Sequence, residues 1–205
     1  MHSSSIALWY LSRATGVVCL ILFTAVVVLG LLVSTQRKLP GLPRFGSVSL
    51  HRYISLLALG FLAVHILTAV ADSYVSISPL AAVIPLASAY KPLWLGLGAV
   101  SVDLGIAVVV TSLLRARIGR RTWRAVHWLA YACWPVAVLH SIGTGPDLRS
   151  GLPLWLTLAS VAAVLAAIGW RTASALRQTP AARFVPELLA TRELSPRRHM
   201  KAIHQ

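Results

Sequence analysis

Four histidines stand at the ends of two apolar stretches of this chain. The stretch "HRYISLLALGFLAVH" begins at His51 and ends at His65, and "HWLAYACWPVAVLH" begins at His127 and ends at His140. An imidazole exchanges a proton near neutral pH, and its nitrogen lone pair binds metal ions. Ionisable side chains are rare inside membrane-spanning stretches, and where they occur they mark proton, ion or cofactor sites. These four residues are therefore the first candidates for chemistry.

The surrounding composition is that of a polytopic membrane protein. Of the 205 residues, 57% are hydrophobic and 12% are charged, whereas soluble domains contain about 25% charged residues. A helix that crosses a bilayer needs about 20 apolar residues, and we expect five such spans, the first of them retained rather than cleaved as a signal peptide. The spans cover residues 6–34, 48–71, 93–114, 123–143 and 152–170. The expected fold class is therefore an all-α polytopic membrane bundle.

The net charge of +14 comes largely from two connections and the C-terminal tail. The first and third connections, with their flanks, contain these basic residues: Arg37, Lys38, Arg44, Arg52, Arg115, Arg117, Arg120, Arg121 and Arg124. The second and fourth connections contain only Lys91 and Arg149. Basic loops stay in the cytoplasm, so we expect the N-terminus outside and the C-terminus in the cytoplasm. The same rule explains the charge without a nucleic-acid partner.

With this orientation the two histidine-bearing spans run in the same direction across the membrane. His51 is then level with His127 near the inner face, and His65 is level with His140 nearer the outer face. The two levels lie about 20 Å apart along an ideal helix. A haem iron accepts an axial imidazole on each face, so this arrangement suits two b-type haems. We predict an inner haem bound by His51 and His127 and an outer haem bound by His65 and His140.

The four histidines could also serve roles other than haem binding. A single histidine in a span more often forms an interhelical hydrogen bond or belongs to a proton path, but four at two matched depths favour haem. The helical phase leaves His51 and His65 within about 40° of one face, whereas His127 and His140 are about 140° apart on an ideal helix. Because Pro135 lacks an N–H and disrupts the helix around it, we expect a distortion there that turns His140 towards the other span.

Arg13 is a charged residue inside the first span, about 10 Å from its outer end. A membrane-embedded arginine costs about 2.5–3.5 kcal/mol and is expected to have a partner. The candidates are a propionate of the outer haem, Asp103 at a similar depth, and the outer lipid headgroups reached by snorkelling. Asp103 itself is expected to belong either to a proton path or to a structural pair.

The two histidine spacings, His-x13-His and His-x12-His, and the flank "GRRTWRAVHWLAY" at 119–131 resemble the ferric reductase-like transmembrane domain. That family includes NADPH oxidases, ferric-chelate reductases and the haem subunit of the bacterial methionine-sulfoxide reductase system. The resemblance covers residues 6–170, although the family commonly has one more span than the five expected here. It implies the same ligand pairs and a cytochrome b that passes electrons across the membrane, as the transmembrane component of an oxidoreductase with no catalytic side chain of its own.

No dinucleotide-binding segment is expected in this chain. In "LGLGAVS" the position of the third glycine of a dinucleotide fingerprint is Ser101, so we expect no FAD or NAD(P) site. We assign residues 1–171 to the di-haem domain and residues 172–205 to a basic cytoplasmic tail, interfacial or disordered. The protein is expected to be a multi-pass component of a bacterial-type plasma membrane, in contact with lipid.

The electron donor is then expected to be a separate cytoplasmic flavoprotein or a quinone, and the acceptor a ferric chelate, oxygen or an extracytoplasmic reductase. The sequence also allows two alternative functions. One is a quinol-linked haem subunit of an extracytoplasmic oxidoreductase. The other is a haem-free transporter or assembly subunit that uses its histidines for protons or metal.

Overall fold

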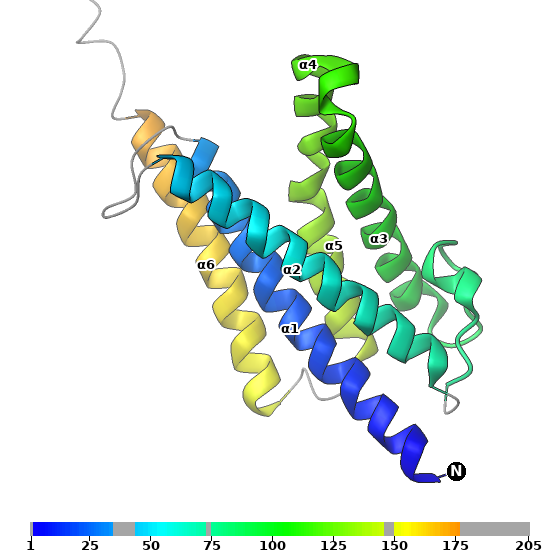
Figure 1. Cartoon of the computed structure of the whole chain (residues 1–205). Coiled ribbons are helices and arrows are strands. Elements are labelled where there is room, and N and C mark those ends of the chain that lie inside the picture. The colour runs from blue at the N-terminus through cyan, green and yellow to red at the C-terminus, as the bar shows by residue number, and fades with distance from the viewer. Residues whose placement is uncertain (1, 35–43, 73–74, 146–149, 177–205) are drawn as a thin grey trace, which may run out of the picture. The chain divides into compact units, whose positions relative to one another are not determined.

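The computed structural model describes residues 2–34, 44–72, 75–145 and 150–176. Its helices are α1 (His2–Ser34), α2 (Arg44–Ala71), the 3-10 helix η1 (Pro79–Ala82), α3 (Pro92–Leu113), α4 (Arg115–His127), α5 (Leu129–Thr144) and α6 (Gly151–Leu176). Figure 1 shows these elements in chain order, and the described residues contain no β-strand.

Five helical segments are long and apolar enough to cross a membrane. They are Ile6–Ser34, Phe45–Ala71, Pro92–Leu113, Arg115–Thr144 and Gly151–Leu176. The all-α membrane bundle and its five spans are therefore confirmed, while the direction of the spans stays a prediction. Helix α6 continues past residue 171, where we placed the end of the haem domain. Most of the tail assigned to 172–205 lies outside the described residues, and its role stays a prediction.

The chain divides into two compact units, Met1–Ala167 and Ile168–Gln205. In the second unit the structure describes only the last residues of α6. In the first unit α1 packs along α2, α3 packs along α5, and α1 also contacts α5 (Figure 1). A small apolar core joins Val27 and Leu31 of α1 to Val164 and Ala167 of α6. Helix α2 thus packs mainly on α1, and α5 packs mainly on α3.

The fourth span consists of two helices that meet directly after His127. The N–H of Trp128 donates to the Arg124 carbonyl at 3.3 Å, and the N–H of Tyr131 donates to the Trp128 carbonyl at 3.0 Å. The second bond reaches back three residues rather than four, as in a 3-10 turn. The backbone is therefore rewound between the two histidines of this span.

Our expectation that Pro135 distorts the span stays a prediction, and the structure adds an interruption at a second position. Pro135 is inside α5, which runs without a break from Leu129 to Thr144. The interruption is at Trp128, two turns earlier. Tyr131 takes part in both irregular hydrogen-bond patterns. Its N–H donates to the Trp128 carbonyl. Its carbonyl would pair with the N–H of residue 135 in a regular helix, but Pro135 has no N–H.

Gly119 produces a second bend, at the start of the fourth span. Its backbone angles are φ 79° and ψ 161°, so α4 contains a non-helical residue at this point. Side chains with a Cβ rarely adopt such a positive φ, whereas glycine does so freely. This glycine separates the short turn after α3 from the residues that lead up to His127.

The second connection packs on α3. The 3-10 helix η1 contacts α3, and Ala81 within it is buried. Leu86 lies so close to α3 that a Cβ on Gly96 would be 3.0 Å from the Leu86 backbone nitrogen. The described residues of this connection therefore lie against the first turns of α3.

Lys91 ties the start of α3 to the end of α5. Its Nζ donates to the carbonyls of Gly143 at 3.2 Å and Thr144 at 3.1 Å. The last carbonyls of a helix have no partners within the helix and carry partial negative charge, so a cation there is favourable. Lys91 therefore closes the end of the α3–α5 pair that contains His140.

We expect Lys91→Met to lower the free energy of unfolding by about 1 kcal/mol, because the two carbonyls lose their charged donor. For a protein of this size the corresponding fall in Tm is about 2–4 °C. Thermal unfolding of the purified protein in detergent measures it. Lys91→Arg is the matched control, since it keeps the charge, and an unchanged Tm in Lys91→Met would show that the contact does not contribute.

Candidate functional site

The structure brings the four histidines together as two pairs. His51 interacts electrostatically with His127, and His65 interacts electrostatically with His140. Each pair joins one histidine of α2 to one of the fourth span. These are the pairs that equal depth predicts, and their role as haem ligands stays a prediction.

His65 is held by the main chain of α1. Its Nδ1 lies 2.8 Å from the Ser12 carbonyl oxygen. A carbonyl only accepts, so Nδ1 carries the proton and Nε2 keeps its lone pair. The ring also faces Gly16, where a Cβ would lie 3.0 Å from His65 Cε1. The sequence did not lead us to expect either contact.

His140 makes the same type of contact with α3. Its Nδ1 donates to the Trp94 carbonyl at 2.8 Å, which again leaves Nε2 with the lone pair. A Cβ on Gly98 would lie 2.6 Å from both Cε1 and Nδ1 of this ring. Metal-binding histidines generally donate their second ring N–H to a carbonyl or carboxylate, which fixes the tautomer and raises ligand basicity. Both histidines of the outer level meet this condition.

Trp94 is itself fixed at this end of the bundle. A Cβ on Gly143 would overlap the Trp94 ring, so the indole is packed closely against the α5 backbone. Lys91 binds the carbonyls of Gly143 and Thr144 in the same turn. The carbonyl that accepts from His140 therefore belongs to a residue with little freedom to move.

The inner level is held differently. The Nδ1 atoms of His51 and His127 are buried, and among the described residues neither has a hydrogen-bond partner. The Val26 carbonyl lies beside the His51 ring, without hydrogen-bond geometry, and a Cβ on Gly30 would be 3.5 Å from His51 Cε1. The tautomers of the inner histidines are therefore not fixed by any described protein group.

Aromatic stacking orients His127 instead. Its ring stacks on Trp123 with the centroids 4.9 Å apart and an interplanar angle of 30°. The Trp123 Nε1 donates to Ser112 Oγ on α3 at 3.3 Å, and the Arg115 guanidinium lies 5.6 Å from the indole centroid. The position of His127 thus depends on an aromatic side chain that is anchored at the end of α3.

Two polar contacts hold α5 between the histidine levels. The Trp134 Nε1 donates to Thr24 Oγ1 on α1 at 3.0 Å. Ser101 of α3 and Cys133 of α5 lie side by side, with the Ser101 Oγ 3.3 Å from the Cys133 Sγ. Because α5 is held to α1 on one side and to α3 on the other, its rotation is restrained between His127 and His140.

Arg13 has a different neighbour from those we expected. Its guanidinium lies 4.2 Å from the centroid of the Trp9 ring, a cation–π contact that lowers the cost of the charge. Asp103 is exposed on α3, and within the described part of the chain no hydrogen bond or ion pair reaches it. The structural pair of Arg13 with Asp103 is therefore not formed, while the propionate contact of Arg13 stays a prediction.

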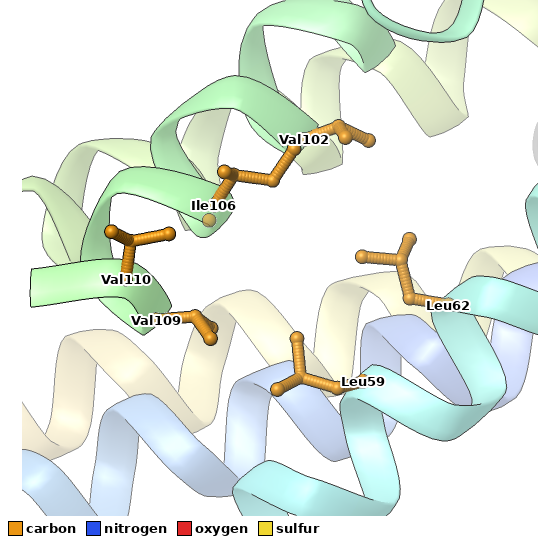
Figure 2. A pocket seen from close by; sticks show the side chains of 7 residues that line it. Leu59, Leu62, Val102, Ile106, Val109 and Val110 are labelled. Atoms are coloured by element: carbon orange, nitrogen blue, oxygen red, sulfur yellow. The ribbon is translucent and has the colours of Figure 1, made fainter. Parts of the chain in front are cut away.

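A pocket of about 160 Å³ lies between α2 and α3. Figure 2 shows Leu59 and Leu62 of α2 facing side chains of α3 across it. Its lining is apolar throughout: Leu59, Leu62, Val102, Gly105, Ile106, Val109 and Val110. Pockets that bind drug-sized ligands have volumes of about 300–1,000 Å³, so this space is too small for a macrocycle. The pocket lies along the apolar face of α2 between His51 and His65.

The donor set fits two haems better than a conventional metal ion. Among the described residues no three histidine, cysteine or acidic side chains gather at one point. An iron in a haem needs only two ligands from the protein, one on each face. Two imidazoles at each of two levels, with the lone pair left on Nε2 at one of them, would fit that requirement.

A family model described as "Ferric reductase like transmembrane component" matches residues 15–144. The matched segment covers more than half of the chain and contains all four histidines. No curated protein and no solved structure matches this chain significantly.

We expect Thr24→Val to lower the free energy of unfolding by about 1 kcal/mol, because the Trp134 N–H loses its acceptor inside the bundle. The fall in Tm, measured in detergent, should disappear in the Trp134→Phe background, where no N–H needs a partner.

Thr111→Val is the matched control for this substitution. The Thr111 hydroxyl donates only to carbonyls of its own helix, those of Ala107 and Val108. An equal fall in Tm for Thr24→Val and Thr111→Val would contradict a specific α1–α5 contact.

Proposed function

The chain belongs to the family of ferric reductase-like transmembrane components, and we propose that it is a di-haem cytochrome b. In this proposal it moves electrons across the membrane from a cytoplasmic-side donor to an acceptor at the outer face. The family membership and the five spans make it an integral multi-pass membrane protein and a membrane redox component in general. The two haems, the direction of electron transfer and the identity of the redox partners are what we propose beyond this.

The observation that carries the proposal is the pairing of the histidines across α2 and the fourth span. His51 and His127 would bind the inner haem, and His65 and His140 would bind the outer one. At the outer level both Nδ1 atoms donate to main-chain carbonyls, so both Nε2 atoms are lone-pair donors. At the inner level two buried Nδ1 atoms are without described partners, which is consistent with rings that serve a group bound between them.

When bound, the haems would supply one-electron redox chemistry, and the residues of this chain would bind and orient them. Each haem would be held by two imidazoles, so the iron would transfer electrons without binding a substrate itself. The apolar side chains of α2 and α3, such as Leu59, Leu62 and Val109, would exclude water from the space between the two levels. This arrangement supports electron transfer rather than substrate chemistry at the metal.

Arg13 supports the outer site from α1. It directly follows Ser12, whose carbonyl binds His65, so it stands at the outer level. We keep Arg13 as the proposed contact for a carboxylate of the outer haem. In the protein without haem, its contact with Trp9 would hold the guanidinium near that level.

The donor in this proposal is a separate cytoplasmic flavoprotein or a quinone. The acceptor is a ferric chelate, oxygen or an extracytoplasmic reductase. A reduced-minus-oxidised spectrum recorded with quinol, and then with NAD(P)H and cytoplasmic extract, distinguishes the two donors.

We expect the purified protein to contain about two haems b per chain, each with two imidazole ligands, by pyridine haemochrome assay. His65→Ala and His140→Ala should each leave about one haem, because either substitution removes a ligand of the outer site and neither touches the inner one. His204→Ala, in the tail, is the control and should retain both haems. A wild-type protein without a Soret band would overturn the proposal and favour a haem-free role for the histidines.

A further inference from the structure

Three of the four histidines face a glycine on a neighbouring helix. His65 faces Gly16, His140 faces Gly98, and His51 faces Gly30. We call Gly16, Gly30 and Gly98 the contact glycines. A Cβ would meet the imidazole at 2.6 Å on Gly98, at 3.0 Å on Gly16 and at 3.5 Å on Gly30. The first distance is impossible without a shift, the second is tight, and the third is an ordinary contact.

Each contact glycine stands four residues after a carbonyl that faces the same histidine. Ser12 precedes Gly16, and Trp94 precedes Gly98, and both carbonyls accept from an imidazole Nδ1 at 2.8 Å. Val26, whose carbonyl lies beside His51, precedes Gly30 by the same four residues. One local arrangement therefore occurs three times, on two different helices.

The direction of side chains in a helix explains this spacing. A helical side chain leans towards the N-terminus and covers the turn before its own Cα. The residue four positions after a carbonyl is therefore the one that covers it. With glycine at that position the carbonyl is open to a second donor, and a flat imidazole can lie against the bare backbone.

The spacing of the glycines on α1 also matches that of the histidines on α2. Gly16 and Gly30 are fourteen residues apart, as are His51 and His65. Two helices packed side by side advance equally per residue, so two equal spacings keep both histidines opposite glycines. His127 differs, because it stacks on Trp123.

We propose that Gly16, Gly30 and Gly98 are positioning residues that set the orientation of His51, His65 and His140 as haem ligands. This inference rests on the proposed function, since it concerns the same site. The glycines act through the imidazoles, because they leave room for the ring to lie against the main chain. For His65 and His140 the Nδ1–H···O=C hydrogen bond then aims Nε2 and makes it a stronger donor, whereas for His51 the glycine only leaves room for the ring. A stronger donor favours ferric iron, so losing the hydrogen bond should raise the midpoint potential of that haem.

The test is a graded series of alanine substitutions in the full-length protein. Gly98→Ala, Gly16→Ala and Gly30→Ala add the same methyl group at decreasing overlap with a histidine. Gly60→Ala and Gly105→Ala are the controls, because a Cβ at either position meets nothing within 4 Å. Alanine favours a helix more than glycine does, so the controls should fold at least as well as the wild type.

We measure haem per chain, the midpoint potentials by redox titration, and the low-temperature electron paramagnetic resonance signals of the ferric haems. Gly98→Ala should affect the outer haem most, either halving its occupancy or raising its potential with a changed resonance signal. Gly16→Ala should shift the same haem in the same direction by less. Gly30→Ala should leave the outer haem unchanged and alter the inner haem least of all, and the controls should match the wild type.

The proposal is overturned if Gly16→Ala and Gly98→Ala keep the wild-type potential and resonance signal of the outer haem. It is also overturned if Gly60→Ala shifts them as much. Should Gly98→Ala fail to fold, Gly16→Ala decides the question, since a displacement of a few tenths of an ångström relieves its contact. A haem-free wild type would instead refute the proposed function, so the two failures are distinguishable.

Discussion

The hydrogen bonds from His65 and His140 to main-chain carbonyls are the interactions on which the outer half of this bundle depends. An imidazole N–H in apolar surroundings has no water to bind, and a helical carbonyl is the one acceptor that every neighbouring helix offers. That carbonyl is normally covered by the side chain four residues later. The bond from His65 to Ser12 leaves little room for a Cβ on Gly16, and the bond from His140 to Trp94 leaves none on Gly98 without a shift. The same contacts therefore pack the helices and orient the two imidazoles.

The two levels of the site differ in how far the protein has organised them. At the outer level the tautomers are set, and Lys91 secures the turn of α5 that follows His140. At the inner level the Nδ1 atoms of His51 and His127 are buried without described partners, and stacking on Trp123 orients one ring only. A buried unpaired nitrogen costs about 1–3 kcal/mol. The protein therefore satisfies the inner histidines less completely than the outer ones.

The fourth span resolves a conflict between spacing and direction. Thirteen residues place His127 and His140 on different faces of an ideal helix, yet both face partners on α2. The backbone has a tighter turn at Trp128, directly after the first histidine, which changes the helical phase in this interval. Bonds from Trp134 to α1 and from Cys133 to α3 then hold the helix in its rotated position. A straight helix of the same composition would span the membrane equally well but would not bring both rings to α2.

From the sequence alone one can derive the five spans, the all-α class and the equal depth of the histidine pairs, because hydrophobicity reports the spans and the rise per residue is constant. The resemblance to the family could also be read from the histidine spacing. Only the tertiary structure decides that the fourth span is interrupted at Trp128, and that Arg13 contacts Trp9 rather than Asp103. It also decides which carbonyls accept from His65 and His140. These contacts depend on how each helix is rotated against its neighbours, and that rotation is determined by packing between helices, which spacing along one helix does not contain.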